Sequence, residues 1–272
     1  MEQELIRSAA PPSAPFPVLP AIGVLHPVAE PFLRQRVLTA VDCLQRIVRA
    51  YPGSPALQDF LDVPPVLHRW IVRHPRPESL TVDFCRLDLF GDRLGTVRVL
   101  EFNASSPGGV IGAGIVARLW RRTPGIGALL DQWRAPGGRF EDENWFAERA
   151  TLRTIVPWSR KLGDGITVEQ AAAGRTRLVL KAPYGYVGNS VRIGCEHGPE
   201  EWAELVGSPQ HQGWLVQERV APAAVGALTR DLCVAVLDRT VLGYFSRAGR
   251  SSLVNLARGG GVQTVLSSFP AA

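Results

Sequence analysis

Four polar side chains at alternate positions in the segment 85–103 could do chemistry together. Arg86 and Asp88 lie in its first half, and Glu101 and Asn103 lie in its second half. Side chains on a β-strand change face at every residue, so each pair shares one face of its strand. The pattern predicts two antiparallel strands joined at 91–95, which would bring two carboxylates, an amide and a guanidinium within cross-strand reach.

The positions between these polar residues are apolar and predict the opposite face of the same hairpin. They are Cys85, Leu87, Leu89, Leu100 and Phe102. If the hairpin keeps the simplest register, we expect these five side chains to form one surface that faces a hydrophobic core.

The polar face of the hairpin has the donor types of a magnesium site. Two neighbouring carboxylates repel each other unless a positive charge lies between them. Carboxylate and amide oxygens suit Mg²⁺, which shares its remaining positions with phosphate oxygens. Arg86 would then face those phosphates. The alternative is a solvated sheet face with an ordinary salt bridge, because antiparallel sheets often keep one face in water.

A lysine at the end of an apolar run begins a second segment of interest. The run 177–181 ends at Lys181, the loop 182–189 contains Gly185 and Gly188, and the alternating run 190–194 follows. This pattern predicts a strand, a glycine loop and a return strand. Such a loop can cover the phosphates of a nucleotide, since glycine lets the backbone approach and the ammonium group neutralises phosphate charge.

Five motifs between about residue 82 and residue 265 point to one family. They are Arg86-Leu87-Asp88, Leu100-Glu101-Phe102-Asn103-Ala104 with a Ser-Ser-Pro-Gly turn, Val179-Leu180-Lys181-Ala182-Pro183 with Gly185 and Gly188, Trp214-Leu215-Val216-Gln217-Glu218-Arg219-Val220, and Asn255 with Arg258-Gly259-Gly260-Gly261. Together they resemble the circularly permuted ATP-grasp proteins related to glutathionylspermidine synthetase. The carboxylates precede the lysine loop in the chain, which indicates the permuted order.

The resemblance implies both a fold and an activity. The implied fold is α+β, with two antiparallel or mixed sheets flanked by helices and the nucleotide between them. The implied activity is that of a carboxylate–amine ligase, in which ATP phosphorylates a carboxylate and an amine attacks the acyl phosphate to form a peptide-type amide. The implied cofactors are ATP and Mg²⁺, and the implied partners are small-molecule or peptide carboxylates and amines. Such chemistry needs mainly positioning and charge neutralisation.

The resemblance also implies roles for individual residues. Asp88, Glu101 and Asn103 would be the Mg²⁺ ligands, and the segment from Gln217 to Val220 would be the hinge that meets adenine and ribose. Contacts to phosphate or to the transition state would come from three arginines, which are Arg86, Arg247 and Arg258. The implied nucleotide contacts are Lys161, Lys181, Gly185, Gly188, Gln217, Glu218, Val220 and Asn255.

Composition and charge exclude several classes of protein. Of the 272 residues, 46% are hydrophobic and 20% are charged, which fits a globular chain rather than a disordered one. We find no run of about eighteen apolar residues and no basic leader before an apolar segment, so we expect a cytoplasmic protein without a membrane partner. The four cysteines lie singly, which argues against a zinc cluster or a disulfide framework.

Apolar spacing predicts the elements that must position these residues. Helices are expected over 31–51, 54–60, 65–74, 110–121, 143–152, 167–173 and 199–206, and further strands over 213–220, 230–237, 241–247 and 252–257. The proline-rich stretch 8–29 predicts an extended arm, and the first helix could pair with a second copy to form a homodimer. We expect an N-terminal helical region with the metal-binding hairpin, 1–125, and a nucleotide-binding half with the lysine loop and hinge, 126–272.

Two other classes of function stay open. A catalytically degenerate ATP-binding or scaffold module would keep the fold without ligase activity. An arginine-rich nucleic-acid binder is the weaker option, because the net charge of +5 comes without a basic block. The set of Arg86, Asp88, Glu101 and Asn103 favours the enzyme, since a scaffold has no need of clustered carboxylates.

Overall fold

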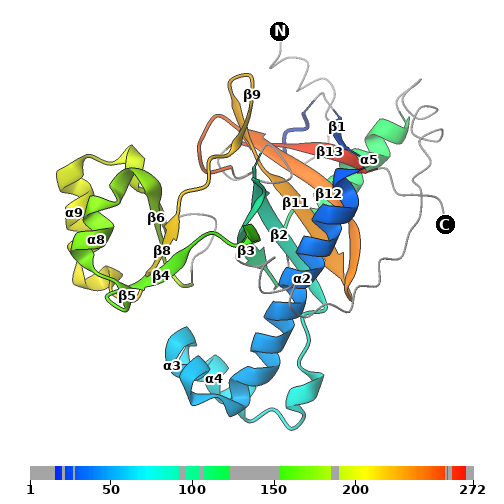
Figure 1. Cartoon of the computed structure of the whole chain (residues 1–272). Helices are drawn as coiled ribbons and strands as arrows, with labels where there is room; N and C mark the ends of the chain where they lie inside the picture. The colour runs from blue at the N-terminus through cyan, green and yellow to red at the C-terminus, as the bar shows by residue number, and fades with distance from the viewer. Residues whose placement is uncertain are drawn as a thin grey trace.

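The chain forms an α+β structure built on two β-sheets (Figure 1). The computed structural model describes residues 16–19, 22–26, 28–91, 96–104, 107–122, 154–184, 190–254, 256 and 259–267. The expected α+β class with two sheets is therefore confirmed. Within these residues, no helix combines the length and the apolar character needed to cross a membrane.

Among the described residues, the larger sheet has eight strands, which come from both halves of the chain. Its main path runs in the order β1 (Gly23–Leu25), β13 (Gly261–Ser267), β12 (Thr240–Gly249), β11 (Leu232–Leu237), β2 (Phe84–Phe90) and β3 (Arg98–Asn103). A short hairpin of β9 (Ala223–Val225) and β10 (Leu228–Arg230) extends one end of β12. Neighbouring strands are antiparallel except for β1 and β13, which are parallel.

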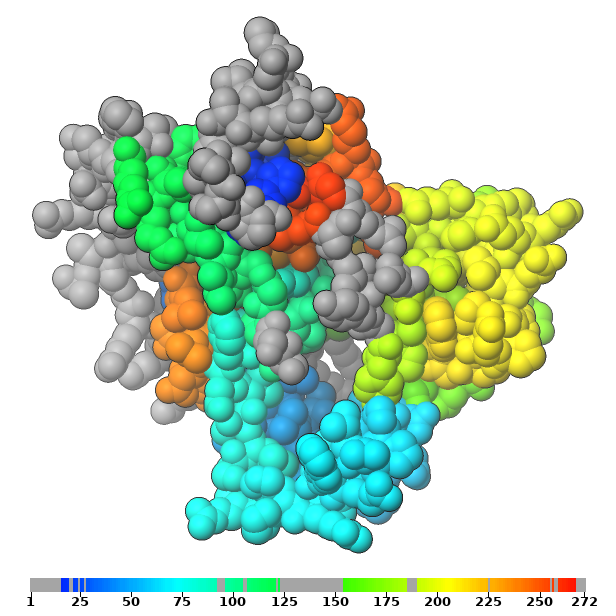
Figure 2. Space-filling model, turned by 180° about the vertical axis from the view of Figure 1, so that it is seen from behind, coloured from blue at the N-terminus to red at the C-terminus, as the bar shows by residue number. Residues whose placement is uncertain are grey.

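The smaller sheet is built from the middle of the chain and forms a separate lobe. Its five strands run in the order β5 (Gly165–Ile166), β4 (Ser159–Leu162), β8 (Leu215–Glu218), β6 (Leu178–Lys181) and β7 (Val191–Ile193). Helices α8 (Val168–Ala173) and α9 (Pro199–Gly207) cover its outer face, where Leu180, Val216 and the fully buried Trp202 form the core of the lobe. Seen from behind, this lobe stands beside the larger sheet (Figure 2).

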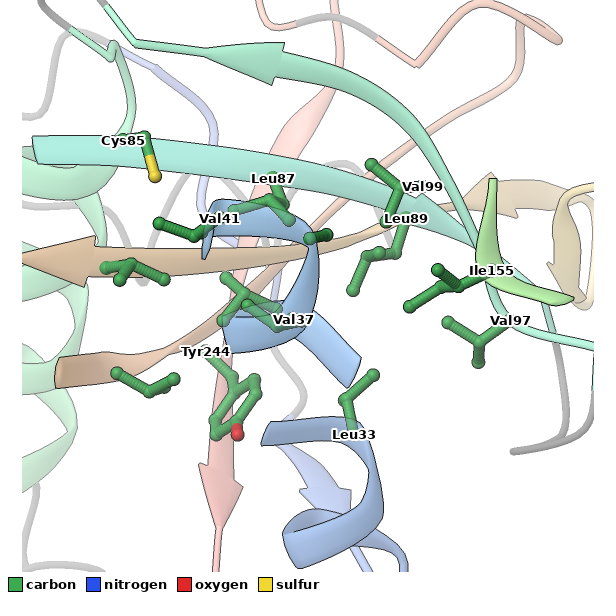
Figure 3. Close-up of a cluster of buried hydrophobic side chains, with 14 residues drawn as sticks. Leu33, Val37, Val41, Cys85, Leu87, Leu89, Val97, Val99, Ile155 and Tyr244 are labelled. Atoms are coloured by element: carbon green, nitrogen blue, oxygen red, sulfur yellow. The ribbon is translucent and has the colours of Figure 1, made fainter. Parts of the chain in front are cut away.

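Helix α2 (Ala29–Ala50) packs on one face of the larger sheet because its apolar residues recur at helical spacing. Figure 3 shows Val37 and Val41 of this helix facing Leu87 and Leu89 of β2, and all four side chains are buried. Helix α5 (Val110–Arg122) covers part of the opposite face, where Val116 packs in a core cluster with Phe245. The polar face of the hairpin lies on this second face.

Two short helices, α3 (Pro55–Leu61) and α4 (Pro65–Val72), follow α2 and lie below the small-sheet lobe in Figure 1. Ser54 caps α3 by accepting a hydrogen bond from the Leu57 backbone N–H, at 3.3 Å. The phenol of Tyr184 donates to the Leu61 carbonyl, at 2.8 Å, and so joins the end of α3 to the start of the lysine loop.

The register of the hairpin confirms its polar face and corrects its apolar one. Arg86 pairs with Asn103 and Asp88 pairs with Glu101, as the alternation predicts. A β-bulge follows Asp88, and Leu89 then pairs with Val99 instead of Leu100. Val99 is therefore the buried core residue, whereas Leu100 turns away from that core. The prediction for Leu100 was wrong because a bulge shifts the alternation by one position.

Other predictions met different outcomes. The predicted helices within the described ranges are found as α2, α3, α4, α5, α8 and α9, whereas the one expected over 143–152 lies outside those ranges. Residues 251–253 form bends and residue 254 belongs to no strand, whereas a strand was expected over 252–257. The last strand in the described ranges is β13. The expected division at residue 125 does not follow the sheets, because β2 and β3 share one sheet with β11, β12 and β13.

Candidate functional site

A cleft between the two sheets gathers most of the polar residues singled out above. It encloses about 890 Å³ of empty space, its opening to solvent included. The larger sheet and its connections contribute Asp88, Phe90, Leu100, Glu101, Asp231, Arg247, Ser252, Leu253 and Val254. The smaller sheet and the segment that leaves it contribute Val179, Lys181, Val191, Ile193, Gln217, Glu218, Arg219, Val220 and Pro222. A ligand bound in this cleft would contact side chains of both sheets.

Strand register explains which face of the small sheet lines the cleft. Lys181 pairs with Val191 on one side and with Leu215 on the other. Directly paired residues point to the same face, so the cleft side alternates with the positions that pack under α8 and α9. Leu180 and Val216 occupy those packed positions. The alternation of 178–181 therefore aims the Lys181 ammonium at the hairpin of the larger sheet.

The two predicted carboxylates converge on one amide. The Asn103 Nδ2 donates to Asp88 Oδ2 at 3.3 Å and to Glu101 Oε1 at 3.2 Å. Desolvation in the cleft and the adjacent Asp88 raise the pKa of Glu101. A cation that bound here would relieve this repulsion. The structure thus brings Asp88, Glu101 and Asn103 together, as the spacing predicts.

Asp88 is buried and held by two arginines. Arg86 donates from Nε to Oδ1 at 2.6 Å and from Nη2 to Oδ2 at 2.8 Å, and Arg247 donates from Nη2 to Oδ2 at 2.8 Å. Burial alone would raise the pKa of Asp88, but Arg247 and Arg86 outweigh it and hold the pKa well below its usual range. Arg86 also donates to the Gly108 carbonyl, which ties the turn before α5 to the site.

Asp231 is a site residue that the motifs do not reveal. It is 3% exposed, lies between β10 and β11, and lines the cleft. Its Oδ1 accepts from the Arg247 backbone N–H at 2.8 Å, and its Oδ2 accepts from Arg247 Nε at 2.8 Å. The only sequence signal is a carboxylate directly before the apolar run 232–237, a position that a solvated residue could equally occupy.

Lys181 connects the two sheets. Its Nζ donates to Gln217 Oε1 at 2.6 Å and to the Leu100 carbonyl of β3 at 3.2 Å. Desolvation lowers the pKa of Lys181, and the charges of Glu101 and Asp88 oppose this shift. Gln217 is buried and donates from Nε2 to Ser159 Oγ at 3.1 Å, so its side chain is oriented from the far side.

The remaining predicted residues are distributed differently. Glu218 and Val220 line the cleft beside Pro222, where the chain leaves the small sheet. Lys161 does not line it, because its ammonium group lies 5.0 Å from the centre of the Phe60 ring of α3. Gly185, Gly188, Asn255 and Arg258 lie outside the described residues.

The donor set fits a hard cation such as Mg²⁺. Two carboxylates and an amide meet in the cleft, and no partner is found for Asn103 Oδ1 in the described part of the chain. Glu101 is exposed to the cleft. Over the same residues, no group of three or more His, Cys, Asp or Glu side chains is arranged to hold a metal ion.

The charged groups of the cleft balance one another. Lys181, Arg219 and Arg247 line the cleft, and Arg86 binds Asp88 beside it, which gives four positive charges. The four negative charges come from Asp88, Glu101, Glu218 and Asp231. No protein-family model matches the chain, and no curated protein matches it either. The function of this site is therefore inferred from its geometry and its charges.

Proposed function

We propose that the protein is an ATP-dependent carboxylate–amine ligase of the circularly permuted ATP-grasp type, which forms an amide bond through an acyl phosphate. One observation carries this proposal. Asp88, Glu101 and Asn103 converge on one sheet, and Lys181 of the other sheet reaches the same hairpin at the cleft between them. A carboxylate pair, an ammonium group and an arginine are the groups that phosphoryl transfer requires.

Both apolar and charged side chains line the cleft. Val179 and Ile193 of the small sheet and Leu253 of the larger one provide apolar walls for a base. The backbone N–H groups of Glu218 and Arg219 already donate to the carbonyls of Trp158 and Arg177, at 2.7 and 2.8 Å. The base would therefore meet the backbone of Val220, and the Glu218 carboxylate would meet the ribose. The triphosphate would then extend towards Lys181 and Arg247.

Asp88, Glu101 and Asn103 would hold Mg²⁺, which supplies charge neutralisation for the phosphates. Arg247 and Lys181 would bind and orient the terminal phosphoryl group as it passes from ATP to an oxygen of the substrate carboxylate. The amine nitrogen would then attack the acyl carbon. The C–N bond forms, the C–O bond to phosphate breaks, and the amine proton leaves to solvent. The products are an amide, ADP and phosphate.

A phosphate-release screen tests the proposal. The purified chain is incubated with Mg·ATP and with pairs of amino acids or short peptides, each offered as acid and as amine. We expect phosphate release only with a matching pair, and the amide appears by mass spectrometry in equal amount. Absence of Mg·ATP binding to the chain would rule the proposal out.

One observation favours a second candidate, a nucleotide-binding module without ligase activity. Both oxygens of Asp88 already accept hydrogen bonds from arginines, and these bonds compete with a metal ion. Such a module would bind Mg·AMP-PNP, a non-hydrolysable ATP analogue, but would release no phosphate with any acid and amine pair. The screen and a binding measurement together separate the two candidates.

A further inference from the structure

Asp231 binds both the backbone and the side chain of one residue, Arg247. The Oδ1 atom accepts from the Arg247 backbone N–H, and Oδ2 accepts from Nε, both at 2.8 Å, while Nη2 also donates to Oδ2. The Cys233 thiol also donates to this carboxylate, with its Sγ 3.8 Å from Oδ1. Asp231 is thus committed to Arg247 and makes no bond to the other arginine of the site, Arg86.

The backbone around Asp231 holds this carboxylate in place. The Asp231 N–H donates to the Arg247 carbonyl at 3.1 Å, and the Ser246 hydroxyl donates to the Asp231 carbonyl at 2.6 Å. Four hydrogen bonds therefore join Asp231 to residues 246 and 247 of β12 before the bond from Nη2 is considered. A carboxylate on such a support has little freedom to follow a moving arginine.

The arrangement determines how the guanidinium is presented to the cleft. Asp231 takes Nε and Nη2, and Asp88 takes Nη2 from the other side at 2.8 Å. A guanidinium is planar, so two fixed nitrogens define the direction of the third. No partner is found for Arg247 Nη1 in the described part of the chain, and Arg247 lines the cleft.

We propose that Asp231 is the positioning residue for Arg247, which it holds with Nη1 directed at the terminal phosphate of the nucleotide. This inference rests on the proposed function, because it assigns a phosphate contact to Arg247. It adds a residue that acts without touching the nucleotide: pre-organised donors need not reorganise when charge develops on a transferred group.

A purely electrostatic role for Asp231 predicts the opposite sign. Removing one negative charge next to Arg247 would increase the attraction of the cleft for a triphosphate. Positioning predicts weaker binding, because an unsupported guanidinium can turn towards Asp88 and withdraw Nη1 from the ligand. The direction of the change in affinity therefore distinguishes the two roles.

The test is a double-mutant cycle on the full chain. Dissociation constants for Mg·AMP-PNP and Mg·ADP are measured by calorimetry for the wild type, Asp231→Asn, Arg247→Ala and the double variant. We expect Asp231→Asn to weaken Mg·AMP-PNP binding about tenfold relative to Mg·ADP, and to have less than about a twofold effect in the Arg247→Ala background. Asp42→Asn is the matched control, since it breaks the surface ion pair of Asp42 with Arg239, which is 2.9 Å long.

Two further measurements cover the cases in which the cycle alone would not decide. Asp231→Glu keeps the charge and displaces the carboxylate, so it should also weaken Mg·AMP-PNP binding. This variant takes the place of Asp231→Asn in the test if Asp231→Asn fails to fold. In ¹H–¹⁵N spectra, the Arg247 Nε–H signal is identified as the one that disappears in Arg247→Ala. This signal should resist hydrogen exchange in the wild type and in the control Asp42→Asn, and it should lose that protection in Asp231→Asn.

The outcomes separate this inference from the proposed function. Two outcomes overturn the positioning role alone, provided that the wild type binds Mg·AMP-PNP. In the first, Asp231→Asn binds Mg·AMP-PNP as tightly as the wild type or more tightly. In the second, Asp231→Asn weakens binding to the same extent in the Arg247→Ala background. A wild type that binds no nucleotide overturns the proposed function and with it the phosphate contact. The Nε–H signal still decides, in that case, whether Asp231 fixes Arg247.

Discussion

Arg247 reaches across a neighbouring strand to bind Asp88. Arg247 lies on β12 and Asp88 on β2, with β11 between them, and Nη2 is 2.8 Å from Oδ2. Both side chains are buried, with residue exposures of 9% and 2%. A buried carboxylate needs such partners because desolvation of an unpaired charge is costly. The same contact places an arginine from the last third of the chain at the predicted magnesium site.

Replacing Glu101 by Gln should abolish phosphate release and leave the fold intact. The side chain is exposed to the cleft, and the amide removes the negative charge that a metal ion needs. We expect phosphate release to fall about 100-fold or more, with a change in melting temperature of no more than a few degrees. Glu200→Gln, at an exposed position on α9, is the control. Undiminished turnover in Glu101→Gln would remove Glu101 from the metal site.

Nucleotide affinity should depend strongly on magnesium. Four cationic and four anionic side chains already balance in and beside the cleft, so the four negative charges of free ATP find no excess of positive charge there. We expect chelation of Mg²⁺ to weaken AMP-PNP binding about tenfold or more in titration calorimetry. Equal affinity with and without Mg²⁺ would contradict the assignment of Asp88, Glu101 and Asn103 as ligands.

Replacing Asp88 by Asn should cost about 3–5 kcal/mol of unfolding free energy near neutral pH, because Arg86 and Arg247 lose a buried charge partner. The loss should shrink in acid. The folded-state pKa of Asp88 is depressed, so its stabilisation is complete above the unfolded-state pKa of about 4 and declines as the pH falls below that value.

Urea unfolding of the wild type and of Asp88→Asn at several pH values from 7 down to acid checks this prediction. The difference between the two free energies should be constant above about pH 5 and should decrease below about pH 4. Comparing two proteins at each pH removes the contributions of the other carboxyl groups. A difference that grows in acid would contradict the lowered pKa.

Replacing Tyr244 by Phe should destabilise the attachment of α2 to the larger sheet. The Tyr244 hydroxyl donates to Glu30 Oε1 at 2.7 Å, and Glu30 is 1% exposed. Arg34 also binds this carboxylate, with its Nε 2.9 Å from Oε1, so the variant keeps one partner. We expect a loss of about 1–3 kcal/mol, measured by thermal and denaturant unfolding. Nucleotide affinity should not change, because Tyr244 faces away from the cleft.

Local periodicity was sufficient to predict the polar face of the hairpin. Arg86, Asp88, Glu101 and Asn103 share a face because side chains alternate along any strand, whatever lies around it. The helices of the described ranges followed from apolar spacing in the same way. These features depend on residues near one another in sequence, so the sequence by itself determined them.

Only the tertiary structure decided what meets that face. The bulge after Asp88 directs Leu100 into the cleft, and a bulge depends on the packing of the whole sheet. Asp231 became a site residue because the β10–β11 junction places it beside Arg247. Lys181 reaches the Leu100 carbonyl, 81 residues away, because the two sheets approach each other. Such contacts arise from strand order and sheet packing, which no local pattern of residue types specifies.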